Sequence, residues 1–325
     1  MGDGVMRALF GVCAVAAACS ADGGRSGPAA PAPAASIKID GQVRRDDGRT
    51  VTYRLVGADM GPLIVYLHGS PSSRLDVDYL AARSRRRGAR VVGIDRPGYG
   101  GSTFVRFDAA SIADDVIAVA DALGAKQFAV IGQSSGSAYA WATAALHPDR
   151  VTAVATGGGD VPFEPGTSRW GRLSEAERKG VSLIGTDDVE AERLLAQPDL
   201  PFMDLLKLTD GELELAWKNE VGSADKRTMA NGFGAVIVKT MRESLRQGQV
   251  GWARDNVVRM GPWRFDHGAI KCPATQWYGE QEQQALENAA WVTARLPSVL
   301  TRIVPDRGHF VIFDDWDDVM DFLLR

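Results

Sequence analysis

The chain has 325 residues, of which 45% are hydrophobic and 24% are charged. This composition is that of a globular protein with a sizeable core, which excludes a disordered or fibrous chain. The net charge of -4 lacks the basic excess that neutralises phosphates, so we expect no nucleic-acid partner.

The first residues are typical of an export signal. An apolar run from Ala8 to Ala18 follows Arg7, and it is too short to span a bilayer, which takes about 20 residues. It ends in small residues before Cys19, which resembles a bacterial lipobox. We therefore predict a signal peptide over residues 1–18 and an exported cell-envelope lipoprotein whose only membrane contact is a lipid on Cys19. Cleavage without lipidation, giving a secreted protein, is the alternative.

A regular alternation of strands and helices follows a low-complexity segment. Residues 19–36 are mostly small residues and proline, so we predict a flexible tether there. Strands alternating with helices of about a dozen residues imply crossover connections, and hence a parallel sheet with helices on both faces. The predicted strands are 50–55, 63–67, 90–94, 128–131 and 151–156, and the predicted helices are 76–87, 111–123 and 135–147.

This alternation lapses between residues 157 and 266, where the patterns are mostly helical. The predicted helices there are 173–179, 190–195 and 233–246, and strands resume at 274–278 and 300–304, with helices at 285–296 and up to Leu324. We predict an α/β core, residues 37–156 and 267–325, interrupted by a helical cap over 157–266.

Residues 132–136 read GQSSG, a G-x-S-x-G pattern centred on Ser134. A predicted strand runs into it and a predicted helix leaves it, which is the setting of a nucleophile elbow. Ser134 is therefore the predicted nucleophile, and the backbone N–H of Ser135, at the helix N-terminus, is a predicted oxyanion donor. The alternative is a plain Gly/Ser turn with a helix-capping serine.

Four histidines are candidates for the base that would activate Ser134. The acid and the histidine follow the serine in the chain order of this motif, which excludes His68 and His147. His309 comes directly after the last predicted strand, at the carboxyl edge of the sheet, where α/β sites form. His267 lies at the amino end of a strand, so we expect a packing role for it. His309 is the predicted base.

Two loops after earlier strands complete the predicted site. Ser70 follows the strand at 63–67, in a turn that can aim its backbone N–H at the same oxyanion. Residues 95–102 follow the next strand and lack the spacing of a phosphate-binding loop, so we expect a structural loop bordering the site. No C-x-x-C pair, H-E-x-x-H or EF-hand loop occurs, so no metal site is predicted.

Taken together, these motifs resemble the α/β-hydrolase superfamily. The matching segments are HGSP at 68–71, DRPGYGGS at 95–102, GQSSGS at 132–137, HPDRV at 147–151, WYGE at 277–280 and GH at 308–309. The resemblance implies the α/β-hydrolase fold with a helical cap, no cofactor, Ser134 as nucleophile, His309 as base, and oxyanion donors at Ser70 and Ser135. Because the nucleophile is serine and not aspartate, the epoxide-hydrolase and haloalkane-dehalogenase branches are not expected.

The acid of the triad is where this sequence departs from the family pattern. The family usually places Asp three residues beyond a Gly after strand 7, and that position here is Glu282, counted from Gly279. Glutamate can also accept the histidine N–H. Asp160, at the end of strand 6, is the main alternative, and Glu280 or no carboxylate at all is the third.

The predicted function is that of a serine hydrolase acting on an ester or related acyl bond of a small molecule. Peptidase, thioesterase and carbon–carbon hydrolase activities use the same triad, and a non-catalytic ligand-binding protein of the same fold is a further alternative. Four cap tryptophans, Trp170, Trp217, Trp252 and Trp263, either line an apolar acyl pocket or form the core of the cap. If they line the pocket, uncharged acyl groups should be preferred over charged ones.

Overall fold

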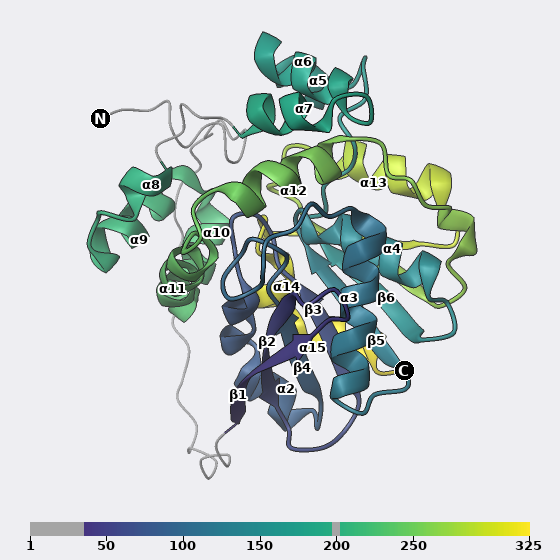
Figure 1. Cartoon of the computed structure of the whole chain (residues 1–325). Helices are drawn as coiled ribbons and strands as arrows, with labels where there is room; N and C mark the ends of the chain where they lie inside the picture. The colour runs from purple at the N-terminus through teal and green to yellow at the C-terminus, as the bar shows by residue number, and fades with distance from the viewer. Residues whose placement is uncertain (1–35, 197–201) are drawn as a thin grey trace.

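The computed structural model describes residues 36–196 and 202–325. Within them, one eight-stranded sheet has the order β1-β2-β4-β3-β5-β6-β7-β8 (Figure 1). The strands are β1 (Ile37–Arg44), β2 (Thr50–Gly57), β3 (Leu63–Leu67), β4 (Arg90–Ile94), β5 (Phe128–Gln133), β6 (Val151–Gly157), β7 (Ala274–Gly279) and β8 (Leu300–Val304). Strands β3 to β8 run parallel, whereas β2 pairs antiparallel with β1 and β4. The predicted fold class, a mostly parallel α/β sheet, is confirmed.

Helices cover both faces of this sheet because its central strands are apolar on both sides. All five residues of β3 are buried, and successive side chains point to opposite faces. Ile64 accordingly packs with α2 (Ala81–Arg86), α14 (Val311–Asp314) and α15 (Trp316–Leu323). Val65 packs on the opposite face with α3 (Ala109–Ala122), α4 (Gly136–Leu146) and α13 (Ala285–Arg295).

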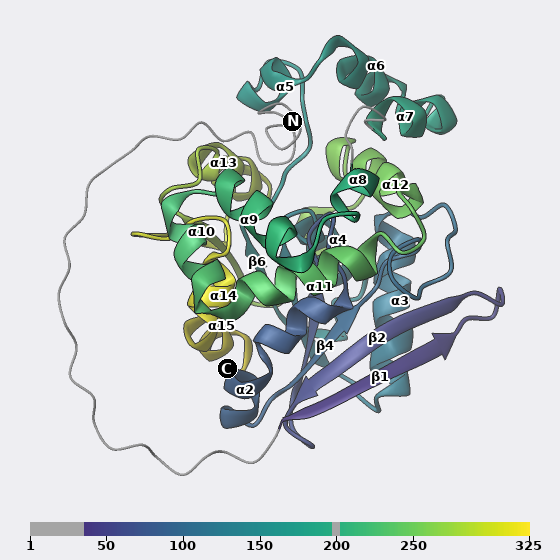
Figure 2. The ribbon, with the colours of Figure 1, turned by 90° about the vertical axis from the view of Figure 1, so that its left-hand side faces the viewer.

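Two local features differ from the sequence prediction. Strand β1 was not predicted, because its sequence is polar and largely exposed and gains its conformation from pairing with β2 at the sheet edge (Figure 2). The predicted helix at 76–87 is divided into a 3-10 helix, η1 (Arg74–Tyr79), and α2. The Ser73 hydroxyl caps η1 by accepting the N–H of Leu75, so the helical segment begins earlier than predicted.

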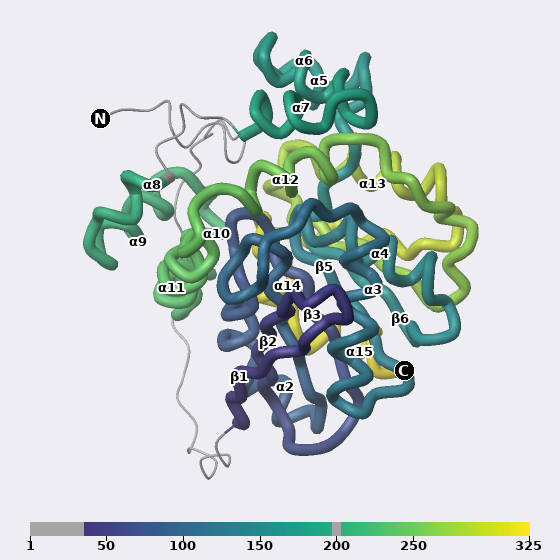
Figure 3. The backbone as a smooth tube through the Cα atoms, in the orientation of Figure 1, coloured from purple at the N-terminus to yellow at the C-terminus, as the bar shows by residue number. Residues whose placement is uncertain are grey.

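A helical segment separates β6 from β7, and its described residues contain no strand. The helices are α5 (Ser168–Arg172), α6 (Glu175–Leu183), α7 (Asp188–Leu195), α8 (Phe202–Leu205), α9 (Asp210–Glu220), α10 (Ser223–Thr228), the π-helix η2 (Met229–Phe233), α11 (Gly234–Ser244) and α12 (Val250–Met260), followed by a 3-10 turn, η3 (His267–Ala269). In Figure 3 this segment, teal-green to light green, lies along one end of the core, whose tube runs from purple through blue and then yellow. We call it the cap.

The cap is held in two different ways. Helices α6, α7 and α12 enclose a small apolar cluster of their own, which includes Leu195 and Met260. Helices α9 and α11 instead contribute Trp217 and Ile237 to the apolar cluster on one face of the sheet. Trp252 and Trp217 are buried, whereas Trp170 and Trp263 are half-buried.

The predicted signal peptide, Cys19 and nearly all of the predicted tether lie outside the described residues. Among the helices that the structure does describe, none has the length and apolar character needed to cross a bilayer.

Candidate active site

Ser134 occupies the sharp turn between β5 and α4. Its φ of 53° lies in the left-handed region, which is costly for a residue with a side chain. The turn is held by the Ser134 N–H, which donates to the Gly157 carbonyl oxygen at 2.8 Å. A Cβ at Gly136 would collide with the Leu67 carbonyl, so only glycine fits there. This is the strained strand-turn-helix geometry predicted from the G-x-S-x-G pattern.

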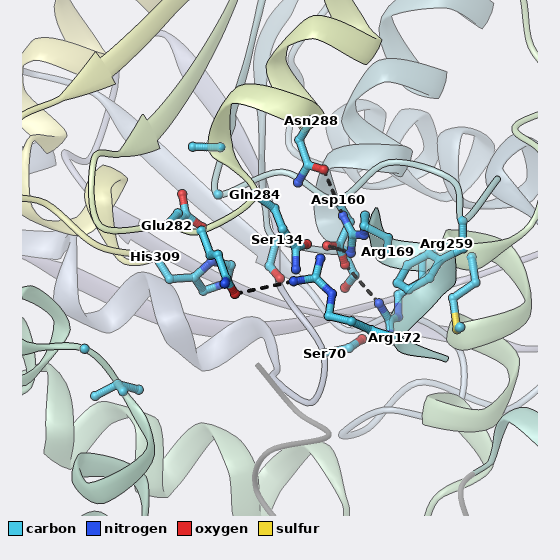
Figure 4. Close-up of a pocket in the computed structure, with 18 of the residues that line it drawn as sticks. Ser70, Ser134, Asp160, Arg169, Arg172, Arg259, Glu282, Gln284, Asn288 and His309 are labelled. Carbon is cyan, nitrogen blue, oxygen red and sulfur yellow. Dashed lines mark hydrogen bonds and ion pairs between the residues drawn. The ribbon is translucent and has the colours of Figure 1, made fainter. Parts of the chain in front are cut away.

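His309 and Glu282 come together from the loops that follow β8 and β7. His309 Nδ1 lies 2.6 Å from Glu282 Oε1, and the Gly279 N–H donates to Glu282 Oε2 at 3.2 Å. Burial alone would lower the pKa of His309, but the hydrogen bond and charge of Glu282 raise it to about 9. Both side chains line the same cavity as Ser134 (Figure 4).

Asp160 has different partners, although it lies close to the same turn. Its carboxylate pairs with Arg169 at 2.5 Å and with Arg259 at 3.0 Å. Burial opposes ionisation, yet the two guanidinium groups lower the pKa of Asp160 to about 2. The third alternative, Glu280, accepts the N–H of Asp306 at 3.4 Å. Of the three candidate acids, Glu282 is therefore the partner of His309 Nδ1.

Ser70 and Ser135, the predicted oxyanion donors, both line the cavity beside Ser134. Ser135 is the N-cap residue of α4, so its N–H belongs to the set that has no carbonyl partner within the helix. The Ser70 hydroxyl donates to Asp255 and accepts from Arg96 at 2.9 Å. The two residues that carry the predicted donors thus line the same cavity as the nucleophile.

A fully buried ion pair supports the Ser70 loop. Arg96, from the loop after β4, lies 2.6 Å from Asp255 on α12, and neither side chain is exposed to solvent. Tyr99 also donates to Asp255, at 3.0 Å, and Tyr139 donates to it as well. Because an unpaired charge would be costly here, this network fixes the loop and joins it to the cap. Residues 95–102 border the site, as predicted.

Asp225, on cap helix α10, contacts the loop that carries His309. Its carboxylate accepts the backbone N–H of His309 at 3.0 Å and that of Phe310 at 2.8 Å. Burial raises the pKa of Asp225 to about 6, although the positive charge of His309 opposes this. A Cβ at Gly308 would collide with the same carboxylate. The cap therefore holds the histidine loop directly.

Gln133 holds the same loop from the core side. Its side-chain amide donates to the His309 carbonyl oxygen at 2.8 Å. The end of β5 is thereby connected to the loop that carries His309.

Of the four histidines, only His309 lines the cavity. His68 is buried, and its Nδ1 contacts the Gly69 carbonyl at 2.6 Å; burial and Arg96 lower its pKa well below the usual value. His147 pairs with Asp114 at 3.2 Å. His267 stacks among aromatic rings at the amino end of β7, and burial lowers its pKa to about 4.

The cavity has two lobes that meet at Ser134, Ser70 and His309. The larger, of about 280 Å³, lies between the cap and the carboxyl ends of the strands and carries three arginines, Arg169, Arg172 and Arg259. The smaller, of about 60 Å³, is lined mainly by aromatic and aliphatic side chains. Its polar lining residues include Asp76 and Thr240. Its apolar members are Trp217, Phe233, Ile237, Phe310 and Phe313. No group of three metal-ligating side chains occurs among residues 36–196 and 202–325.

Solved structures with this architecture are numerous. A structure reported with the carboxylesterases of Nitrososphaera gargenis aligns with a TM-score of 0.61 and 16% identity, over 87% of this chain and 98% of its own. An esterase from Exiguobacterium antarcticum aligns with a TM-score of 0.59 and 18% identity, over 88% of this chain and 98% of its own. The chain has the α/β-hydrolase fold. A family profile described as the alpha/beta hydrolase fold also matches residues 62–179, so the predicted resemblance is confirmed.

Curated relatives match only part of this chain. Epoxide hydrolase B of Mycobacterium tuberculosis is 41% identical over 107 residues, which are 32% of this chain and 30% of the relative. The bifunctional esterase/perhydrolase of Acinetobacter calcoaceticus is 38% identical over 98 residues, which are 30% of this chain and 36% of the relative. The matches thus span about a third of each relative.

The sequence did not identify the cap residues that complete the site. Asp225 and Asp255 are separated from their partners His309 and Arg96 by 84 and 159 residues. No local spacing connects such pairs. The available signal was only that each is the one acidic residue of its cap helix.

Proposed function

We propose that the protein is a serine hydrolase that cleaves an ester or related acyl bond of a small molecule. The observation that carries this proposal is the 2.6 Å contact between His309 Nδ1 and Glu282 in the cavity that also contains the strained Ser134. A nucleophile, a base and an orienting carboxylate in one cavity are the requirements of acyl transfer.

In this proposal each group has one role in the reaction. Ser134 Oγ attacks the carbonyl carbon while His309 Nε2 takes its proton, and Glu282 accepts the Nδ1–H and stabilises the imidazolium. The N–H groups of Ser70 and Ser135 donate to the oxyanion of the tetrahedral intermediate. His309 then protonates the leaving alcohol. Water, activated by His309, hydrolyses the acyl-serine and restores the free hydroxyl.

The names of the curated relatives raise epoxide opening as a second candidate function. Attack of a serine hydroxyl on an epoxide carbon would form an ether, which has no carbonyl group for water to attack. A carboxylate nucleophile would form an ester, which water can cleave. With serine at position 134, a catalytic cycle on epoxides would stop after one turnover, so acyl hydrolysis is the better-supported function.

The test compares Ser134→Ala with Ser182→Ala, an exposed serine on α6 outside the cavity. We expect Ser134→Ala to lower kcat/KM for 4-nitrophenyl butyrate by at least about a thousandfold, since the nucleophile is removed. Ser182→Ala should resemble the wild type, and all three proteins should share one melting temperature. Full activity of Ser134→Ala, or repeated turnover of styrene oxide by the wild type, would overturn the proposal.

We further propose that the protein is exported and held at the membrane through a lipid on Cys19. The support is the signal-like run that ends in small residues before this cysteine. One acyl chain binds membranes only weakly, whereas the several chains of a lipidated N-terminal cysteine give stable anchoring.

A further inference from the structure

We propose that the larger lobe of the cavity binds a carboxylate of the substrate, with Arg172 as its principal ligand. This inference rests on the proposed serine hydrolase function and specifies its substrate class. The preferred substrate is an ester in which one half is small and apolar and the other half carries a carboxylate.

Within the described part of the chain, Asp160 is the one carboxylate lining this lobe that pairs with its guanidinium groups. Figure 4 shows Arg169, Arg172 and Arg259 around Asp160 on one side of the pocket, with His309 on the other side. Asp160 neutralises only part of this charge, because it is a single carboxylate shared by Arg169 and Arg259.

Arg172, the last residue of α5, is the guanidinium group that Asp160 does not reach. Its terminal nitrogens face side-chain amide oxygens, that of Gln283 at 3.4 Å and that of Gln284 once its amide is oriented to accept. Among residues 36–196 and 202–325, no carboxylate oxygen lies within 4.0 Å of it. Arg172 is exposed at the rim of the lobe; partial burial and the like charge of Arg169 lower its pKa, and the charge of Glu287 opposes this shift.

The other carboxylates of the lobe are engaged elsewhere. Glu282 faces His309, and Asp225 accepts the two N–H groups of the histidine loop. Glu177 accepts the N–H of Ser174 at 2.8 Å in the capping box of α6. In addition, Nε of Arg169 is buried without a hydrogen-bond partner. Within the described residues, the lobe therefore contains guanidinium N–H groups that no carboxylate accepts, and its other carboxylates bind groups elsewhere.

A carboxylate is the ligand that suits this arrangement. The planar fork of arginine matches a carboxylate in bidentate geometry, and such charge-assisted hydrogen bonds are stronger than neutral ones. The small lobe, on the other side of Ser134, has room for only a short alkyl group. The inference departs from the sequence-based expectation that uncharged acyl groups are preferred, because that expectation considered the cap tryptophans and not its arginines.

The experiment measures kcat/KM for two matched pairs of esters. In the first pair the carboxylate is on the acyl half, mono-4-nitrophenyl glutarate against 4-nitrophenyl pentanoate. In the second it is on the alcohol half, 4-acetoxybenzoate against its methyl ester. Each pair is measured on the wild type, on Arg172→Met, and on Arg178→Met, which removes the same charge from a cap helix outside the cavity.

We expect the wild type to prefer the anionic ester in one of the pairs by about tenfold, the effect of one charge-assisted contact. Arg172→Met should abolish that preference, Arg172→Lys should restore part of it, and Arg178→Met should keep it. Preference for the neutral ester in both pairs, or an unchanged ratio in Arg172→Met, would overturn the inference while leaving the serine hydrolase proposal intact. If the wild type hydrolyses none of the four esters, the proposed function fails and this inference fails with it.

Discussion

The basicity of His309 depends mainly on Glu282, with smaller contributions from the charges of Asp225 and Asp160. The contact with Glu282 raises the pKa of His309 to about 9, and the base must be neutral to accept a proton from Ser134. The kcat/KM of the wild type should therefore rise with pH and level off only near pH 9. Removing the carboxylate charge should lower the pKa of His309 and move the rising limb of the pH–rate profile toward lower pH.

The first prediction uses this dependence to separate the candidate acids. Glu282→Gln should lower kcat by up to about 10⁴ and shift the limb of the pH–rate profile toward the ordinary histidine value of about 6.5. Asp160→Asn removes the partner of Arg169 and Arg259, so it should lower stability while shifting that limb less than Glu282→Gln does, because the charge of Asp160 contributes less to the pKa of His309. The measurement is a pH–rate profile of each variant with a neutral ester.

If only Asp160→Asn lost turnover and shifted the limb, the carboxylate at the end of β6 would be the acid. The role of Glu282 would then be wrong.

At the scale of secondary-structure elements, helix α10 of the cap is connected to the loop that precedes α14. Asp225 makes this connection through two backbone hydrogen bonds, and it is only 6% exposed. A carboxylate from another element that accepts two backbone N–H groups fixes the His309 loop, because leaving buried donors unpaired is costly. It is a positioning residue, because it acts on the substrate only through His309.

The second prediction is that Asp225→Asn lowers kcat by roughly tenfold with little change in KM. Asparagine keeps an acceptor oxygen for one N–H but loses the negative charge that helps raise the pKa of His309. The pH–rate limb should therefore also move to lower pH, by less than in Glu282→Gln. The matched control is Asp149→Asn, an exposed aspartate after α4. A lower melting temperature of Asp225→Asn, with a pH–rate profile that does not shift, would contradict a positioning role.

The elements that the sequence predicted well are those defined by local patterns. Strand β5 with the G-x-S-x-G turn located Ser134, and the loop after β8 located His309. Strand β1 was missed because a polar edge strand depends on its neighbour and not on its own apolar residues. The contacts of Asp225, Asp255 and the three arginines could not be predicted, since they arise from cap helices packing on distant loops.

At the scale of the whole molecule, the cavity is formed jointly by the cap and the sheet. Apolar packing is continuous from β3 to Trp217 and Ile237 of the cap, and the ion pair of Arg96 with Asp255 adds a second connection. The cap should therefore remain on the core during catalysis, and the lobes should keep their unequal polarity.

The third prediction concerns where this molecule resides. If Cys19 is lipidated, the native protein should sediment with membranes and be released by detergent. Cys19→Ala should abolish processing or release the protein in soluble form, whereas Cys13→Ala, within the predicted signal peptide, should change neither outcome. Wild-type protein found wholly in the soluble fraction would contradict the lipid anchor.

The central claim is that Ser134 is an activated nucleophile, and covalent labelling with a fluorophosphonate probe tests it most directly. Only a serine with a functioning base and oxyanion donors reacts rapidly with such a probe. We predict one probe per chain, located on Ser134 by peptide mass spectrometry, a labelling rate that rises toward pH 9, and much slower labelling in Glu282→Gln. Absence of labelling in the folded wild type, or equal labelling of Ser134→Ala, would contradict the claim.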